Sequence, residues 1–125
     1  MRVSVVVVDD NPRFRLLAAR LLNAGDMVVV GQAGTVHEAL QLVIALRPDA
    51  VLVDVGLPDG DGVALCRRLS GLPWRPRIVL TSSDRDATTA EAALAAGALG
   101  FVAKDDLPDG SLKRMLAGEQ PPEYR

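Results

Sequence analysis

The sequence has little cysteine and little histidine, and it has no long hydrophobic run. Cys66 and His37 are the single representatives of their types among 125 residues. One cysteine excludes an internal disulfide framework and a cysteine-based zinc site, and it fits a reducing compartment, so we expect a cytoplasmic protein. The longest apolar run, around residues 5–8, is far too short to span a bilayer, and the N-terminus lacks the pattern of a signal peptide. We therefore expect neither membrane insertion nor export.

The chain also lacks a large excess of either positive or negative charge. The chain carries 14 basic and 16 acidic side chains, a formal net charge of −2. No net positive field favours nucleic acid or an anionic membrane, so we expect no direct nucleic-acid binding by this domain and no membrane partner. The length and the 49% hydrophobic content suit one compact soluble domain.

Short β-branched runs alternate with longer stretches of helical periodicity, which is typical of βαβ units. The five predicted strands are 3–8, 27–30, 50–53, 77–80 and 99–103. The first is continuously apolar, as expected for a central strand that helices cover on both faces. Because crossovers between parallel strands are right-handed, the pattern predicts the α/β class: a flavodoxin-like (βα)5 three-layer sandwich with strand order 2-1-3-4-5.

Capping residues and apolar spacing mark the helices. Asn11 caps the first helix ahead of Pro12, and Thr35 begins a capping box before the second. The predicted inner faces are Phe14, Leu17, Ala18 and Leu21 in the first helix, Val36, Ala39, Leu40 and Val43 in the second, and Leu65, Cys66 and Leu69 in the third. A fourth helix, about 87–96, has a poor apolar face, and a short fifth lies around 112–116. Segment 56–62 is so rich in turn residues that we expect an irregular loop.

Polar residues stand at the ends of four predicted strands. They are Asp9 and Asp10 after the first, Asp54 after the third, Thr81 after the fourth and Lys104 after the fifth. In an open parallel sheet, ligands bind beyond these carboxyl ends, near the point where the strand order reverses. Three carboxylates in one crevice repel each other unless a cation supplies the missing charge. Oxygen ligands without histidine or cysteine suit Mg²⁺, and one carboxylate in such a site can act as a nucleophile towards phosphorus.

Four segments in this order resemble the receiver domain of bacterial two-component response regulators. They are Asp9-Asp10, Asp54 with Gly56-Leu57-Pro58 and Asp61-Gly62, Leu80-Thr81-Ser82, and the run from Gly97 to Lys104. Each is weak alone, but together they are specific, and the resemblance covers residues 3–117. Segments 30–33 and 38–40, and the aspartate after Lys104, are similar to the NarL/LuxR-type subgroup, which usually carries a C-terminal helix-turn-helix DNA-binding domain.

The resemblance implies a phosphoacceptor rather than an enzyme, with at most slow self-phosphorylation and self-dephosphorylation. Asp54 would accept a phosphoryl group from a sensor histidine kinase in a Mg²⁺-dependent reaction. Asp9, Asp10, Asp54 and the backbone carbonyl of Gly56 would hold the metal directly or through water.

The same resemblance assigns the phosphoryl oxygens to Thr81 and Lys104. It also makes Phe101 the aromatic switch residue, which turns inward when the threonine moves towards the phosphate. Two departures stand out: Asp105-Asp106 follows the lysine where proline is common, and Leu57 replaces a frequent methionine. The first means that a cis peptide is not to be assumed there.

Residues 1–118 are predicted to form the receiver domain, and 119–125 a tail or the start of a linker. The subgroup resemblance implies control of transcription through a DNA-binding domain absent from this sequence. The alternative is a stand-alone receiver that acts by protein–protein contact. A homodimer would use the fourth helix, fifth strand and fifth helix, or another helix face.

Two other functions share parts of this pattern. A small haloacid-dehalogenase-like phosphatase also uses an aspartate nucleophile. That class has a second acid two residues after the nucleophile, whereas the residue two positions after Asp54 in this chain is Gly56. A flavodoxin-like cofactor binder would need a phosphate-cradling loop after the first strand, where Asp9 and Asp10 would repel FMN phosphate. His37 is interpreted as a surface residue and Cys66 as a buried, inert thiol.

Overall fold

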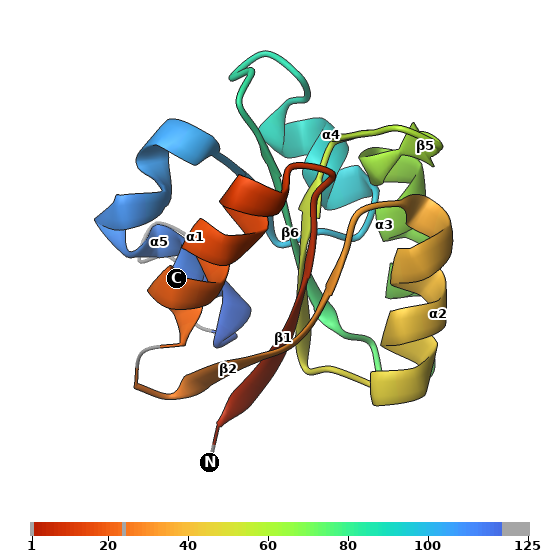
Figure 1. Cartoon of the computed structure of the whole chain (residues 1–125). Coiled ribbons are helices and arrows are strands. Elements are labelled where there is room, and N and C mark those ends of the chain that lie inside the picture. The colour runs from red at the N-terminus through yellow and green to blue at the C-terminus, as the bar shows by residue number, and fades with distance from the viewer. Residues whose placement is uncertain (1, 24, 119–125) are drawn as a thin grey trace.

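Five parallel strands form the central sheet of the structure, a computed structural model that describes residues 2–23 and 25–118 (Figure 1). Their order is β2-β1-β3-β6-β7. The strands are β1 (Val3–Val8), β2 (Met27–Ala33), β3 (Ala50–Asp54), β6 (Arg77–Ser82) and β7 (Gly100–Ala103). This confirms the predicted order 2-1-3-4-5 of the main strands. The tail predicted for 119–125 lies outside the described residues.

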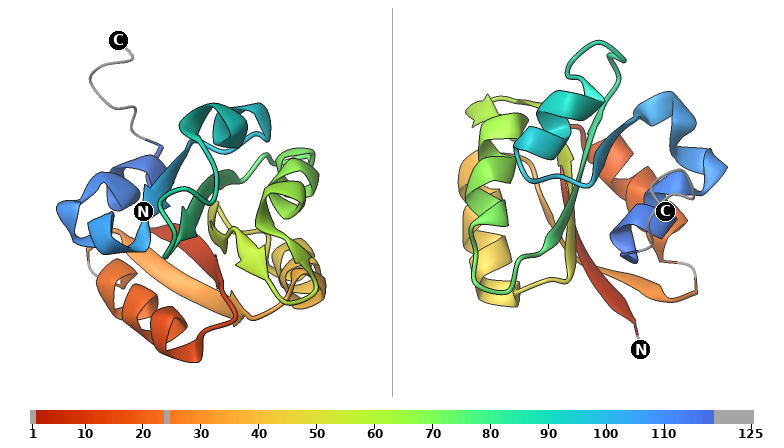
Figure 2. Two further views of the ribbon diagram at one scale, coloured as in Figure 1. Left: turned by 90° about the horizontal axis from the view of Figure 1, so that it is seen from above. Right: turned by 180° about the vertical axis from the view of Figure 1, so that it is seen from behind.

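Helices cover both faces of the sheet and make three layers (Figures 1 and 2). α1 (Pro12–Leu22) and α5 (Ser111–Leu116) lie on one face, and α2 (Val36–Leu46), α3 (Gly62–Ser70) and α4 (Ala90–Ala95) on the other. Alternate residues of β1 enter the two cores: Val5 and Val7 face α1 and α5, whereas Val6 and Val8 face α2 and α3. All four are fully buried, which confirms the prediction of a central strand.

The predicted caps begin α1 and α2. The side-chain oxygen of Asn11 accepts a hydrogen bond from Arg13 N over 2.9 Å, and Thr35 Oγ1 accepts one from Glu38 N over 3.1 Å. Glu38 Oε1 in turn accepts from Thr35 Oγ1 over 3.3 Å. These bonds fix where each helix starts relative to the strand before it.

The predicted inner faces of α2 and α3 are confirmed, but that of α1 is partly wrong. Leu17 is 61% exposed, whereas Phe14, Ala18 and Leu22 are buried. The short α1 contacts the sheet along the i, i+4, i+8 row rather than along the i, i+3 row that leads to Leu17.

The connections hold more regular structure than predicted. The loop after β3 contains a two-residue antiparallel pair, β4 (Gly56–Leu57) and β5 (Gly60–Asp61), so the expectation of a wholly irregular loop was wrong. The turn residues at 58–59 make a hairpin there, because they reverse the chain between the paired residues. β2 extends to Ala33 through a bulge at Val30, and a 3-10 helix, η1 (Lys104–Asp109), follows β7. α4 begins at Ala90, later than predicted, since Thr89 rather than an earlier residue caps it.

Candidate phosphoacceptor and metal site

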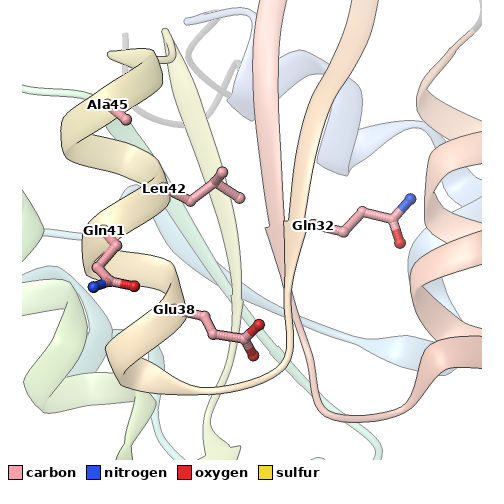
Figure 3. A pocket seen from close by; sticks show the side chains of 5 residues that line it. All are labelled: Gln32, Glu38, Gln41, Leu42 and Ala45. Carbon is pink, nitrogen blue, oxygen red and sulfur yellow. The ribbon is translucent and has the colours of Figure 1, made fainter.

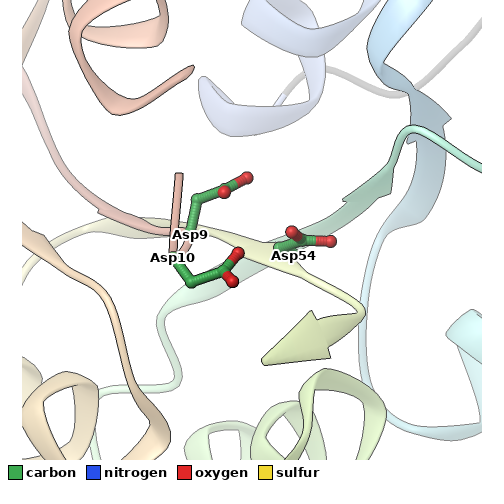
Figure 4. A group of neighbouring side chains, drawn as sticks. All are labelled: Asp9, Asp10 and Asp54. Carbon is green, nitrogen blue, oxygen red and sulfur yellow. The ribbon is translucent and has the colours of Figure 1, made fainter. Parts of the chain in front are cut away.

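Three carboxyl groups meet at the carboxyl end of the sheet (Figure 4). Asp9 and Asp10 follow β1, and Asp54 is the last residue of the neighbouring strand β3. One carboxylate oxygen from each lies within 4.8 Å of the others. Asp9 is fully buried and Asp54 is 7% exposed, whereas Asp10 is exposed. The structure thus brings together the three acids that the sequence predicted to share a crevice.

Lys104 supplies a positive charge to this cluster. Its Nζ lies 2.8 Å from Asp9 Oδ2 and 3.5 Å from Asp54 Oδ2. Lys104 is the first residue of η1, so the end of β7 delivers its side chain to the acids. Within the described residues this ammonium is the only partner of Asp9 Oδ2. The ammonium contacts two of the three clustered carboxyl groups, so the cluster keeps an excess of negative charge.

Three hydrogen bonds hold Asp9 in place, two at its backbone and one at its carboxylate. Its amide donates to the carbonyl of Ala33 over 2.9 Å, and its own carbonyl accepts from the guanidinium of Arg15 over 2.6 Å. The carboxylate oxygen Oδ1 of Asp9 accepts a hydrogen bond from Asn11 N over 2.9 Å. Asp9 is therefore held in place before any ligand binds.

Burial raises the pKa of Asp54 from its ordinary value, and the carboxylate of Asp9 raises it further. The ammonium of Lys104 opposes this rise, as does the hydrogen bond that Asp54 Oδ1 accepts from Gly56 N over 3.2 Å. The two raising effects prevail. An additional cation beside Asp54 would favour the ionised carboxylate that nucleophilic attack requires.

Thr81 lies beside Asp54 in the sheet, because β3 and β6 pair in the register Asp54 to Thr81. Its hydroxyl does not bond to the acids but donates to the carbonyl of Val102 on β7 over 2.6 Å. Ser82, the next residue, is buried. Phe101 is half-buried and packs against the core on the α3 side.

Sequence reasoning missed one residue at this site. Phe14 was interpreted as core, and it is 8% exposed, but its ring centroid also lies 4.1 Å from Lys104 Nζ. The cap at Asn11 was the available signal, since it places residue 14 in the first turn of a helix that starts beside Asp9 and Asp10.

Other features lie away from the acids. A groove of about 270 Å³ between β2 and α2 is lined by Gln32, Glu38, Gln41, Leu42 and Ala45, and none of the strand-end acids lines it (Figure 3). His37 is exposed and Cys66 is buried, which confirms both interpretations of their position. Burial raises the pKa of the Cys66 thiol to about 11, as expected for an inert cysteine.

The donor set fits a hard divalent cation. It consists of carboxylate oxygens from Asp9, Asp10 and Asp54, one from each residue, which lie within 4.8 Å of one another. Mg²⁺ is commonly held by a few carboxylates, water and a phosphoryl oxygen. The uncompensated negative charge described above is the structural reason to expect such an ion.

This fold and this cluster of acids define a class of protein. Residues 5–116 match the family model of the response regulator receiver domain. The chain belongs to the response regulator receiver domain family.

Comparison with individual proteins gives the same result. The chain is 46% identical over 105 residues to the DNA-binding transcriptional activator DevR/DosR of Mycobacterium tuberculosis, a match that covers 82% of this chain and 48% of that protein. It superposes on a LuxR-family two-component response regulator from Aurantimonas with a TM-score of 0.82 and 27% identity, covering 96% and 89% of the two chains. The signal receiver domain of NarL from M. tuberculosis gives a TM-score of 0.76 at 32% identity, covering 94% and 92%.

The chain thus spans about half the length of the transcriptional activator that it matches. Its structural neighbours include LuxR-family and NarL response regulators, which confirms the predicted resemblance. Among the described residues, no helix is both long enough and apolar enough to cross a bilayer.

Proposed function

We propose that Asp54 accepts a phosphoryl group from the phosphohistidine of a sensor histidine kinase, and that the receiver then changes conformation to control an output. The observation that carries this proposal is the position of the Asp54 carboxyl group. It is buried at the end of β3, with the carboxylates of Asp9 and Asp10 on one side and the ammonium of Lys104 3.5 Å away.

In the transfer step, a carboxylate oxygen of Asp54 attacks phosphorus. An O–P bond forms, the P–N bond to the donor imidazole breaks, and the imidazole nitrogen keeps that electron pair and takes up a proton. Lys104 binds the phosphoryl oxygens, as does the hydroxyl of Thr81 once it turns from Val102. The three acids and the carbonyl of Gly56 would hold Mg²⁺, which would neutralise part of the negative charge on the phosphoryl oxygens.

Movement of Thr81 couples the site to the surface. Its hydroxyl must release the carbonyl of Val102 to reach a phosphoryl oxygen, and Phe101 is the neighbouring residue on the same strand. Loss of the bond to Val102 changes the local structure of β7 next to Phe101, and in this proposal the Phe101 side chain then turns inward. The adjoining surface carries exposed apolar side chains at Leu94 and Leu99, which suit a homodimer through α4, β7 and α5.

The output we propose is control of transcription, in the cytoplasm, through a DNA-binding domain beyond this sequence. The named activity of DevR/DosR and the half-length match support it. Within this domain, Asp54 acts as a phosphoacceptor and not as the catalyst of a phosphatase, because Gly56 occupies the position of that class's second acid.

Labelling with a small phosphodonor tests the proposal. Wild-type protein should take up phosphate from phosphoramidate in the presence of Mg²⁺, and D54N should not. Chelation of the metal should stop labelling of the wild type. D59N is the matched control, because Asp59 is an exposed aspartate of the following hairpin and should leave labelling unchanged. Unchanged labelling of D54N would overturn the proposal.

A further inference from the structure

We propose that Phe14 is a positioning residue for Lys104, and that its ring keeps the ammonium at the phosphoryl site throughout the transfer. The proposal rests on the proposed function of Asp54. In this proposal Phe14, a buried side chain of α1, takes part in the chemistry at the carboxyl ends of the strands.

The contact between the two residues joins a cation to an aromatic face. Lys104 Nζ lies 4.1 Å from the centroid of the Phe14 ring. Phe14 is 8% exposed and the side chain of Lys104 is 18% exposed, so water screens the pair little. Attraction between an ammonium and a ring face is strongest when both are removed from water.

The other described contacts of the Lys104 ammonium are two carboxylates, at 2.8 Å from Asp9 and 3.5 Å from Asp54. Both carboxylates change during the proposed reaction. Both would share their negative charge with a metal ion held at the site, and Asp54 loses the negative charge of its carboxylate when one of its oxygens becomes esterified. The ring of Phe14 is the one contact that neither event alters. It therefore restrains the long, flexible side chain of Lys104 when the attraction of the two carboxylates for its ammonium weakens.

The ring itself is held firmly beside Asp9. Asn11 caps α1 through its bonds to Arg13 N and Phe14 N, and Arg15 bonds to the carbonyl of Asp9. Phe14 also belongs to the buried cluster that includes Leu107 of η1, the helix that begins with Lys104. The ring thus links the start of α1 to the start of η1 on either side of the acids.

A purely structural role for Phe14 predicts a different result from a positioning role. F14L keeps an apolar side chain but removes the aromatic face, whereas F14Y keeps the face. L22V is the matched control: Leu22 is fully buried in the same cluster at the far end of α1, so its shortening loosens packing without touching Lys104.

Nuclear magnetic resonance reports the contact without any reaction. The chain contains two lysines, Lys104 and Lys113, so lysine-labelled protein gives two sets of side-chain signals. We expect an upfield ring-current shift of the Lys104 ε-protons relative to those of Lys113. The shift should vanish in F14L and persist in F14Y and L22V.

The rate of labelling by phosphoramidate, measured with Mg²⁺, reports the function. We expect F14L to label about tenfold more slowly than the wild type, and F14Y and L22V to label at close to the wild-type rate. F14L that labels at the wild-type rate, or L22V that slows as much as F14L, would overturn the positioning role. If the wild type shows the ring-current shift but takes no label, the proposed function of Asp54 fails, and the role of Phe14 in it fails as well.

Discussion

The hydroxyl of Thr81 and the carbonyl oxygen of Val102 form a buried hydrogen bond of 2.6 Å that joins β6 to β7. This bond occupies the hydroxyl that the proposed reaction directs to the phosphoryl group. The resting conformation is therefore stabilised by an interaction that the phosphorylated conformation gives up. The free energy lost with this hydrogen bond sets how strongly phosphorylation must stabilise the new conformation.

Removal of the Thr81 hydroxyl should destabilise the domain. T81V keeps the shape of the side chain but leaves the buried carbonyl of Val102 without its donor, which costs about 1–3 kcal/mol. T81S keeps the hydroxyl donor, so its free energy of unfolding should fall less than that of T81V. Urea unfolding followed by the fluorescence of Trp74, the single tryptophan, measures both variants. A T81V protein as stable as the wild type would show that the bond contributes nothing.

Gly56, the first residue of the hairpin after Asp54, and Gly62, which directly follows the hairpin, should respond differently to replacement by alanine. A Cβ on Gly62 would collide with the carbonyl oxygen of Asp54 and lie 2.8 Å from Val55 Cα, so the backbone must move. A Cβ on Gly56 would meet no atom within 4 Å. We expect G62A to cost about 1–3 kcal/mol of unfolding free energy and G56A to change it by less than about 0.5 kcal/mol. Equal effects in urea unfolding would contradict this reading of the turn.

Stability at acid pH should depend on Asp59. Its carboxylate accepts hydrogen bonds from Val36 N over 2.7 Å and His37 N over 3.2 Å, and chiefly the first holds the pKa of Asp59 below its ordinary value of 3.8. A lowered pKa contributes stability that is present above the unfolded value and is lost as pH falls through the folded value.

The variant D59N isolates this contribution. The wild type should be more stable than D59N at pH values above 3.8, and the difference should shrink as pH falls below that value. Thermal unfolding of the two proteins over this pH range measures it. A difference that stays constant with pH would mean that the charge of Asp59 plays no part.

Cys66 should be unreactive in the folded protein. Burial raises the pKa of its thiol to about 11, so about one molecule in a thousand carries the thiolate at pH 8. An aromatic disulfide reagent should modify the native protein slowly and the protein in concentrated guanidinium chloride rapidly. Rapid modification of the native protein would show that the α3 face opens to solvent.

Much of this structure could be predicted from local sequence. The continuous apolar run at 3–8 predicted a central strand, and the polar residues at four strand ends predicted where Asp9, Asp10, Asp54 and Lys104 meet. Those predictions succeed because burial on both faces and the common edge of parallel strands follow from topology alone.

The rest depends on contacts that a sequence does not display. Leu17 matches helical spacing but is exposed, because the helix rotates to place Phe14 against the sheet and Lys104. The bond from Thr81 to Val102 joins residues 21 positions apart and requires the β6–β7 register. The pairing of β4 with β5 within the loop after Asp54 is likewise set by the hairpin turn.

The most direct test of the central claim is the position of the label. Protein treated with acetyl phosphate and Mg²⁺ should gain the mass of one phosphoryl group, and fragmentation should place that group on Asp54. A phosphoryl group on any other residue, or a gain of the same mass by D54N, would contradict the account.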